Sequence, residues 1–371
     1  MRPGGGFLGS YAEFAFRGGN IEEMIVRDIN EPDRGLSARI IPPEPLQLIA
    51  TRWKAADANW FFDFSESAEK TIAFLEASSL YRARGVKFDG AIALSPQVIE
   101  DLLALTGPVP IPGQNLILDS KNFLDVIQSE VQEAQNEKES KPKQILGKAA
   151  PLIVEKLVHL DAEAKRRIGD LARQWIAKRH LMIYAEDAAL QSFFEYYGLA
   201  GTVAQIPRET PSDYLAVVNA NIGGGKTDRV VKQNIRLESV ITAEGAVHNR
   251  LAVSRAHAPR KGDAWWYRVP NQNYMKVFAP LSSKLTSFSG GAEKKITPRV
   301  SYKANGYEPD PLVAAVEATA ERYEAYPAVQ GFTESGKKVF AAWSLVKPEG
   351  KAELVFEYTH TLPEPLRAGE R

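Results

Sequence analysis

The stretches DRVVKQNIRLESVIT, residues 228–242, and AVHNRLAVSRA, residues 246–256, decide the fold of the second half of the chain. Both are rich in valine and other strand-forming residues, and a short segment that ends in Gly245 separates them. This pattern predicts two strands joined by a tight turn. Further strands are expected at 214–218, 265–269, 274–280, 338–346 and 352–359, with a short helix at 311–326. We therefore predict a mostly β, sandwich-like domain over residues 206–371.

Residues 1–205 carry a different pattern, in which strand and helix signals alternate. Gly18-Gly19-Asn20 is a hairpin turn signal between strands expected at 7–16 and 21–29. Ser95 and Pro96 mark a helix start, as N-cap and first helical residue. Helices are expected at 65–84, 95–105, 119–135, 144–159, 161–180 and 187–197, with a strand at 86–94. This alternation predicts an α/β domain over residues 1–205, with a mixed sheet and flanking helices.

The charge balance bears on the partners of the chain. Its 371 residues contain 46 lysines and arginines and 46 aspartates and glutamates, so the formal net charge is zero. A nucleic-acid-binding protein normally shows a basic excess in at least one domain. We therefore expect no nucleic-acid partner.

The chain contains no cysteine, which excludes disulfides, thiolate metal sites and cysteine nucleophiles. This favours a location outside the cytosol, although some cytosolic proteins also lack cysteine. No apolar run approaches the roughly 18 residues that a membrane helix needs. Because Met1 lies directly before a glycine and aromatic motif, we expect the natural chain to extend upstream into a membrane anchor. The expected location is extracytoplasmic, in the cell envelope.

The segment Asn221–Thr227 resembles a nucleotide-binding phosphate loop, because Gly223-Gly224-Gly225 precedes Lys226 and Thr227. That motif requires a glycine where Ala220 stands, and a helix after the loop where a strand is predicted. A turn between strands is the better interpretation, and we expect no nucleotide cofactor.

The candidate site lies around residues 52–64. Asp57 and Asp63 offer carboxylate oxygens, which suit Mg²⁺, and Arg52 suits a phosphate group. Asn59 and Trp60 are candidate ligand-binding residues, with neighbouring aromatic residues able to line an apolar pocket. The alternative is a polar loop whose aromatic residues pack on the core. At the amino terminus, Gly5 and Gly6 either let the backbone approach a ligand closely or only begin a strand tightly.

Five ordered motifs resemble a bacterial family, the domain of unknown function DUF4012. They are Arg2-Pro3-x-Gly5-Gly6-Phe7-x-Gly9-Ser10-Tyr11, Asp57-x-Asn59-Trp60-x-x-Asp63-Phe64, Asp89-Gly90-x-Ile92-Ala93-Leu94, Leu102-Leu103-Ala104-Leu105-Thr106-Gly107-Pro108-Val109, and Asn219-x-Asn221 with Gly224-x-Lys226-x-Asp228. The resemblance covers most of residues 2–290. It implies an upstream membrane anchor, which members of the family commonly carry.

That family is distantly similar to the LytR-CpsA-Psr phosphotransferases, which transfer a glycopolymer from a polyprenyl diphosphate carrier to the cell wall. The shared order of parts implies a LytR-CpsA-Psr-like α/β fold. The Arg-Ser-Asp-Thr strand of those enzymes is absent here, where Gly9-Ser10-Tyr11 stands nearby.

Two functions follow as hypotheses. In the first, the chain is a phosphotransferase on a polyprenyl-phosphate-linked glycan. Asp57 and Asp63 would then hold Mg²⁺, while Arg2 and Arg52 bind the diphosphate and stabilise charge in the transition state, so that Arg2, Arg52 and Asp57 are the catalytic candidates. In the second, the chain is a non-catalytic envelope module that binds a glycan or lipid-linked ligand, or serves as a scaffold.

Overall fold

A computed structural model describes residues 6–137, 144–205, 207 and 211–363 of the chain. The chain divides into two compact units. The β unit contains residues 1–6, 39–53 and 203–371, and the α/β unit contains residues 7–38 and 54–202. The short segment 39–53 therefore belongs with the β unit, although it lies early in the sequence.

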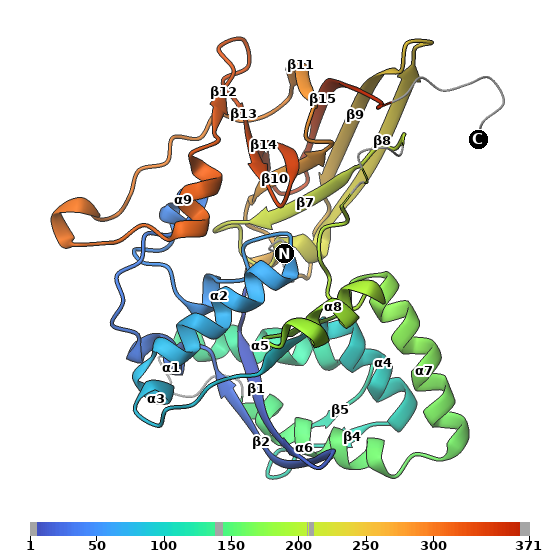
Figure 1. Cartoon of the computed structure of the whole chain (residues 1–371). Coiled ribbons are helices and arrows are strands. Elements are labelled where there is room, and N and C mark those ends of the chain that lie inside the picture. The colour runs from blue at the N-terminus through green and yellow to red at the C-terminus, as the bar shows by residue number, and fades with distance from the viewer. Residues whose placement is uncertain (1–5, 138–143, 206, 208–210, 364–371) are drawn as a thin grey trace. The chain divides into compact units, whose positions relative to one another are not determined.

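The β unit contains two antiparallel sheets (Figure 1). In sheet order, the five-stranded sheet comprises β12 (Glu321–Arg322), β13 (Val329–Glu334), β14 (Lys337–Val346), β10 (Asn271–Ala279) and β7 (Ala216–Asn221). The four-stranded sheet comprises β11 (Lys284–Ser289), β15 (Lys351–Thr361), β9 (Ala246–His257) and β8 (Val231–Ile241). The predicted hairpin is confirmed, because β8 pairs with β9 along its whole length without a register shift.

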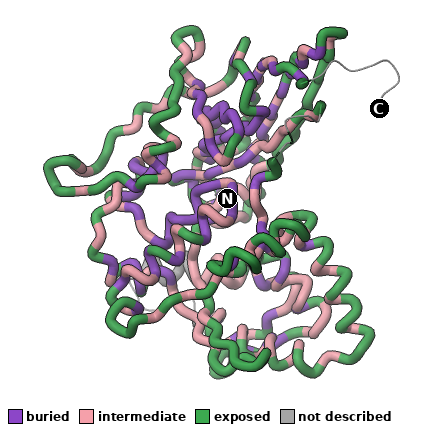
Figure 2. Tube along the Cα trace, viewed as in Figure 1, coloured by how far each residue is buried: buried purple, intermediate pink, exposed green. Residues whose placement is uncertain are grey.

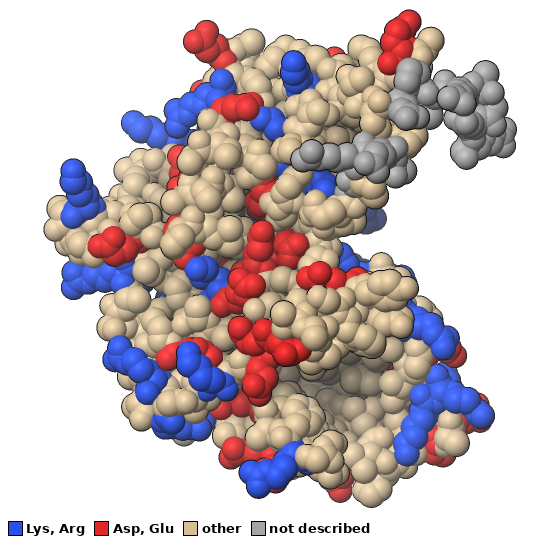
Figure 3. Space-filling view, in the orientation of Figure 1, with Lys and Arg blue, Asp and Glu red and all other residues tan. Residues whose placement is uncertain are grey.

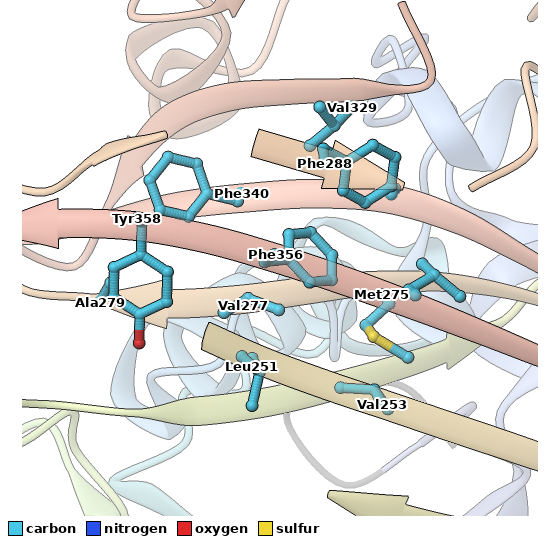
Figure 4. Packing of buried hydrophobic residues seen from close by; sticks show 12 residues of the cluster. Leu251, Val253, Met275, Val277, Ala279, Phe288, Val329, Phe340, Phe356 and Tyr358 are labelled. Atoms are coloured by element: carbon cyan, nitrogen blue, oxygen red, sulfur yellow. The ribbon is translucent and has the colours of Figure 1, made fainter. Parts of the chain in front are cut away.

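Both sheets contribute side chains to one core, as expected of a sandwich. Met275, Val277 and Phe340 come from the five-stranded sheet, while Leu251 and Phe356 come from the four-stranded sheet. Figure 4 shows these side chains facing one another between the strands. The aromatic rings of Phe288 and Phe356 lie 4.8 Å apart. Burial of this layer is the main apolar contribution to the stability of the β unit.

Shorter elements complete the β unit. They are η1 (Glu44–Leu48), η3 (Thr227–Val230), η4 (Trp265–Tyr267), η5 (Lys303–Asn305) and α9 (Pro311–Glu317). The strand predicted at 265–269 is wrong, because Tyr267 and Arg268 donate to carbonyl oxygens three residues earlier and close the turns of η4. The helix predicted at 311–326 ends at Glu317.

The α/β unit contains eight α-helices within its described residues: α1 (Asn30–Gly35), α2 (Phe64–Ala77), α3 (Ser79–Arg82), α4 (Pro96–Thr106), α5 (Phe123–Glu137), α6 (Gln144–Val158), α7 (Ala162–Ala177) and α8 (Ala188–Tyr196). Its strands are β1 (Ser10–Arg17), β2 (Asn20–Asp28), β3 (Gly90–Leu94), β4 (Val109–Pro110), β5 (Ile117–Leu118) and β6 (Leu181–Ala185). In Figure 2, the outer helix α7 is mostly exposed.

Two expectations for this unit need correction. In place of one mixed sheet, its described strands form three separate antiparallel pairs, β1–β2, β3–β6 and β4–β5. The helix expected at 65–84 is interrupted at Ser78, whose backbone is extended and whose Oγ donates to the carbonyl oxygen of Leu75 at 2.6 Å. A side chain that bonds locally to the backbone competes with helix continuation. Among the described residues, no helix is both long enough and apolar enough to cross a membrane.

Candidate functional site

The acidic and aromatic segment around Asp57 lies inside the α/β unit. Asp57 ends the short helix η2 (Ala55–Asp57). Its side chain is buried, as are Asn59, Trp60 and Asp63, all with at most 9% of their surface exposed. The structure therefore brings these four predicted residues together in one buried stretch. The alternative, a loop that packs on the core, predicts the same burial. It also predicts that the buried carboxylates have hydrogen-bond partners, because charged side chains are rarely buried without them.

Asp63 has a structural role at the start of α2. Its Oδ1 accepts a hydrogen bond from the backbone N–H of Ser65 at 2.9 Å, so that Asp63 is the N-cap of the helix. A capping carboxylate satisfies an otherwise unpaired N–H and interacts favourably with the positive end of the helix dipole. One oxygen of this predicted metal ligand is therefore already engaged.

Arg179 anchors the carboxyl-terminal end of the segment, and sequence reasoning did not identify it. Its Nη2 donates to the carbonyl oxygen of Phe62 at 3.0 Å and also to that of Gly201. Its Nη1 donates to the carbonyl oxygen of Thr202 at 3.3 Å, and the guanidinium lies 4.6 Å from the centre of the Phe62 ring. A single side chain thus joins two stretches that lie more than 100 residues apart in the sequence.

A second buried acid, Asp33 in α1, accompanies Asp57. Asp33 is 2% exposed, and its carboxylate accepts from the backbone N–H groups of Ala55 at 2.9 Å and Ala56 at 3.2 Å. Lys54 lies 3.6 Å from its Oδ2. Burial nevertheless raises the pKa of Asp33 above its ordinary value, with the charge of Asp57 adding to the effect. An acid with such a perturbed pKa is a candidate functional residue.

The raised pKa of Asp33 gives a pH prediction. The folded state holds the proton of Asp33 more tightly than the unfolded state, so the free energy of unfolding should fall as the pH rises from about 4 through the raised pKa. Urea unfolding of the wild type and of Asp33→Asn across this range isolates the effect. The difference in stability between the two proteins should shift in favour of the variant as the pH rises. A pH-independent difference would contradict the assignment.

The remaining predicted site residues lie elsewhere. Arg52 and Gly6 belong to the β unit. Arg2 and Gly5 lie outside the described residues. Within the part of the chain that the structure describes, no group of three or more histidine, aspartate and glutamate side chains is placed to hold a metal ion.

A polar network connects the first hairpin to α3. The hydroxyls of Tyr11 and Tyr81 lie 2.5 Å apart, and Tyr81 also donates to Glu13, which pairs with Arg27. Burial raises the pKa of Tyr11 to about 12, so the phenol stays protonated at neutral pH. These contacts pair the polar groups of Tyr11, Glu13 and Arg27 and fix the β1–β2 hairpin against α3.

The glycine loop between β7 and η3 is closed by its own hydrogen bonds. Thr227 Oγ1 donates to the carbonyl oxygen of Gly224 at 2.6 Å, and Asn221 Nδ2 donates to Thr227 Oγ1 at 3.2 Å. A Cβ atom on Gly224 would lie 2.1 Å from Asn221 Oδ1, which explains the need for glycine. The loop leads through η3 into strand β8, which confirms the interpretation of this segment as a turn between strands.

A hollow of about 410 Å³ opens on the β unit beside the start of β11. Glu321 Oε2 accepts from Lys338 at 2.5 Å and from the Tyr323 hydroxyl at 3.2 Å. Ser283 also lines the hollow, is 4% exposed, and has an Oγ without a hydrogen-bond partner among the described residues. Leu281 and Leu285 provide apolar lining. The hollow therefore combines one aromatic side chain, fixed charges and a buried hydroxyl that lacks a partner.

Charge on the molecular surface is mixed. Figure 3 shows both signs of charge on the face that it presents, with several aspartates and glutamates lying next to one another over the α/β unit. This face carries no continuous basic stripe of the kind that nucleic-acid binding uses.

A family model matches the amino-terminal part of the chain. The model of the family described as "Protein of unknown function (DUF4012)" matches residues 1–131. The matched part contains the Asp57–Asp63 segment and Asp33. No curated protein and no solved structure matches the chain.

Proposed function

We propose that the chain is a non-catalytic glycan-binding module of the bacterial cell envelope. The observation that carries this proposal is the hollow lined by Tyr323, Glu321, Lys338 and Ser283. A sugar presents hydroxyl groups, which donate and accept hydrogen bonds, and a C–H face, which packs on an aromatic ring. The hollow offers the carboxylate of Glu321 and the ammonium of Lys338 for the first and the Tyr323 ring for the second. The envelope location rests on the lack of cysteine and on the resemblance to DUF4012.

Binding of soluble cell-wall oligosaccharides, measured by isothermal titration calorimetry, tests the proposal. Tyr323→Ala should weaken binding roughly ten-fold, because the stacking surface is lost. Tyr196→Ala is the matched control, since this tyrosine is 83% exposed and lies on α8. Absence of binding by the wild type, or equal binding by Tyr323→Ala, would rule the hollow out.

A phosphotransferase acting on a polyprenyl-phosphate-linked glycan is the second candidate function. The buried acids Asp33 and Asp57 favour it, because their charges interact and the pKa of Asp33 is raised. Mg²⁺ is commonly bound by one or two carboxylates, with water and substrate phosphate completing its shell. Asp57 would then hold the ion, while Asp33 remains bonded to the backbone N–H groups of Ala55 and Ala56. The ion would stabilise negative charge on the transferred phosphate.

Mass spectrometry of the purified protein distinguishes the two candidates. A co-purified polyprenyl phosphate that is released or turned over only with Mg²⁺ would support the enzyme. In that case Asp57→Asn should abolish turnover, while Tyr196→Ala should leave it unchanged. Glycan binding without turnover would support the module.

A further inference from the structure

The strand β8 forms an open edge of the four-stranded sheet. It follows β9 at the end of the order β11-β15-β9-β8, and no further strand pairs with it within the described residues. It is 11 residues long, contains no proline and has no bulge against β9. Natural proteins usually protect such an edge by shortening it, kinking it or placing proline in it. None of these three protections is present in β8, but the strand carries charged side chains, which are another. It is therefore suited to pair with a strand whose charges match its own.

The odd-numbered residues of β8 direct their backbone hydrogen-bonding groups away from β9. Just beyond the two ends of β8, the backbone N–H of Thr242 donates to the carbonyl oxygen of Ala246, and the N–H of Ala258 donates to the carbonyl oxygen of Val230. Because backbone groups alternate in direction along a strand, the even-numbered residues of β8 are the ones that bond to β9. The odd-numbered residues include Ile235, Leu237 and Ile241. Their side chains are 40–45% exposed, although their partners on β9 are core residues such as Leu251 and Val253. The open edge therefore combines unpaired backbone groups with apolar side chains.

We propose that β8 pairs in antiparallel fashion with β8 of a second copy of this chain. A two-fold axis through Leu237 would place Leu237 opposite Leu237 of the partner, and Ile235 opposite Ser239. Arg236 would then lie opposite Glu238 of the partner, twice by symmetry. The two four-stranded sheets would join into one sheet of eight strands.

Charge selects this register over its neighbours. The backbone groups that point outward belong to odd-numbered residues, so in every allowed register odd-numbered residues of the two copies face each other. The neighbouring allowed registers therefore have their two-fold axis one residue away, at Arg236 or at Glu238. An axis at Arg236 would oppose two arginines, and an axis at Glu238 would oppose two glutamates. Like charges directly opposite each other destabilise a strand pair, whereas opposite charges stabilise it. Arg236 and Glu238 already lie 2.7 Å apart within one chain, so the charged pair is in place at the edge.

The expected dimer is weak, because one strand pair covers less surface than the roughly 1,200–2,000 Å² of a stable interface. Sedimentation equilibrium of the full chain from about 1 μM to about 1 mM covers the relevant range of dissociation constants. Glu238→Arg should weaken the dimer roughly ten-fold, because both charge pairs become repulsive. Arg236→Glu should do the same.

Mixing the two variants provides the decisive measurement. In a mixed dimer, each arginine of the Glu238→Arg chain faces a glutamate of the Arg236→Glu chain, so the mixture should dimerise at least as well as the wild type. A monomeric wild type at 1 mM, or equal association of the wild type, the single variants and the mixture, would overturn the proposal. Thermal unfolding of each variant confirms that it is folded.

Cross-linking tests the register directly, because the chain has no cysteine of its own. Leu237→Cys should form a disulfide-linked dimer on mild oxidation, since residue 237 meets itself across the axis at a spacing of about 5.5 Å between Cα atoms. Lys232→Cys should not, because residue 232 lies opposite residue 242. The reverse pattern would contradict the register.

Discussion

Replacement of Glu334 with alanine is expected to lower the free energy of unfolding by about 3–5 kcal/mol. Glu334, in β13, accepts two hydrogen bonds from Lys276 Nζ, in β10, at 2.6 and 2.8 Å. Both side chains are only 1% exposed. Removal of the carboxylate leaves an ammonium group in the interior of the β unit without its counterion, and the cost of that buried charge is much larger than the net value of the pair.

Urea unfolding, followed by circular dichroism, measures this effect. The double variant Lys276→Met/Glu334→Leu removes both charges while retaining apolar bulk, and should be close to the wild type. Asp170→Ala is a surface control, because its pair with Arg173 is exposed and should contribute less than about 0.5 kcal/mol. A loss of less than about 1 kcal/mol in Glu334→Ala would contradict the assigned burial of the pair.

Arg179→Met is expected to cost about 3 kcal/mol and to loosen the segment around Asp57. Methionine keeps an apolar chain of similar length, but it cannot donate to the carbonyl oxygens of Phe62, Gly201 and Thr202. Arg179 also has a φ of +55°, which a residue with a side chain rarely adopts. Its contacts therefore hold a strained backbone in place.

Chemical unfolding and hydrogen exchange together test this prediction. Arg179→Lys should be intermediate, because it keeps the charge but loses the planar fork that reaches several carbonyl groups. Lys178→Met, the adjacent exposed position, should change stability by less than about 0.5 kcal/mol. Exchange in residues 57–64 should be faster in Arg179→Met than in the wild type. Unchanged exchange there would show that Arg179 does not anchor the segment.

Much of the local structure could be predicted from the sequence. The β1–β2 and β8–β9 hairpins and the helix that starts at Pro96 are confirmed, because turn residues and a proline at the first helical position act over a few neighbouring positions. Ser95 occupies the N-cap position, but its side chain makes no capping hydrogen bond. The strand at 265–269 was wrong, since aromatic residues such as Trp265 and Trp266 favour strands but also occur in tight turns.

The candidate site was only partly predictable. The cluster of Asp57, Asn59, Trp60 and Asp63 was visible, because these residues are close in the sequence. Asp33 could not be predicted as part of the site, because it lies 22 residues before Ala55, whose backbone N–H donates to its carboxylate. The residues of the hollow come from segments far apart in the sequence, such as the turn at Ser283 and strand β14 at Lys338, and give no joint signal in the sequence.

By itself, the sequence determined the change from an α/β half to a mostly β half, because the periods of helices and strands are local properties of the chain. The tertiary structure decided that residues 39–53 belong to the β unit, that β3 pairs with β6, and that Arg179 anchors the segment around Asp57. It also decided that β8 lies at an open edge. The physical reason is the same in each case. Which strands pair and which charged groups meet depends on packing between segments that are distant in the sequence. The residue pattern within one segment does not determine it.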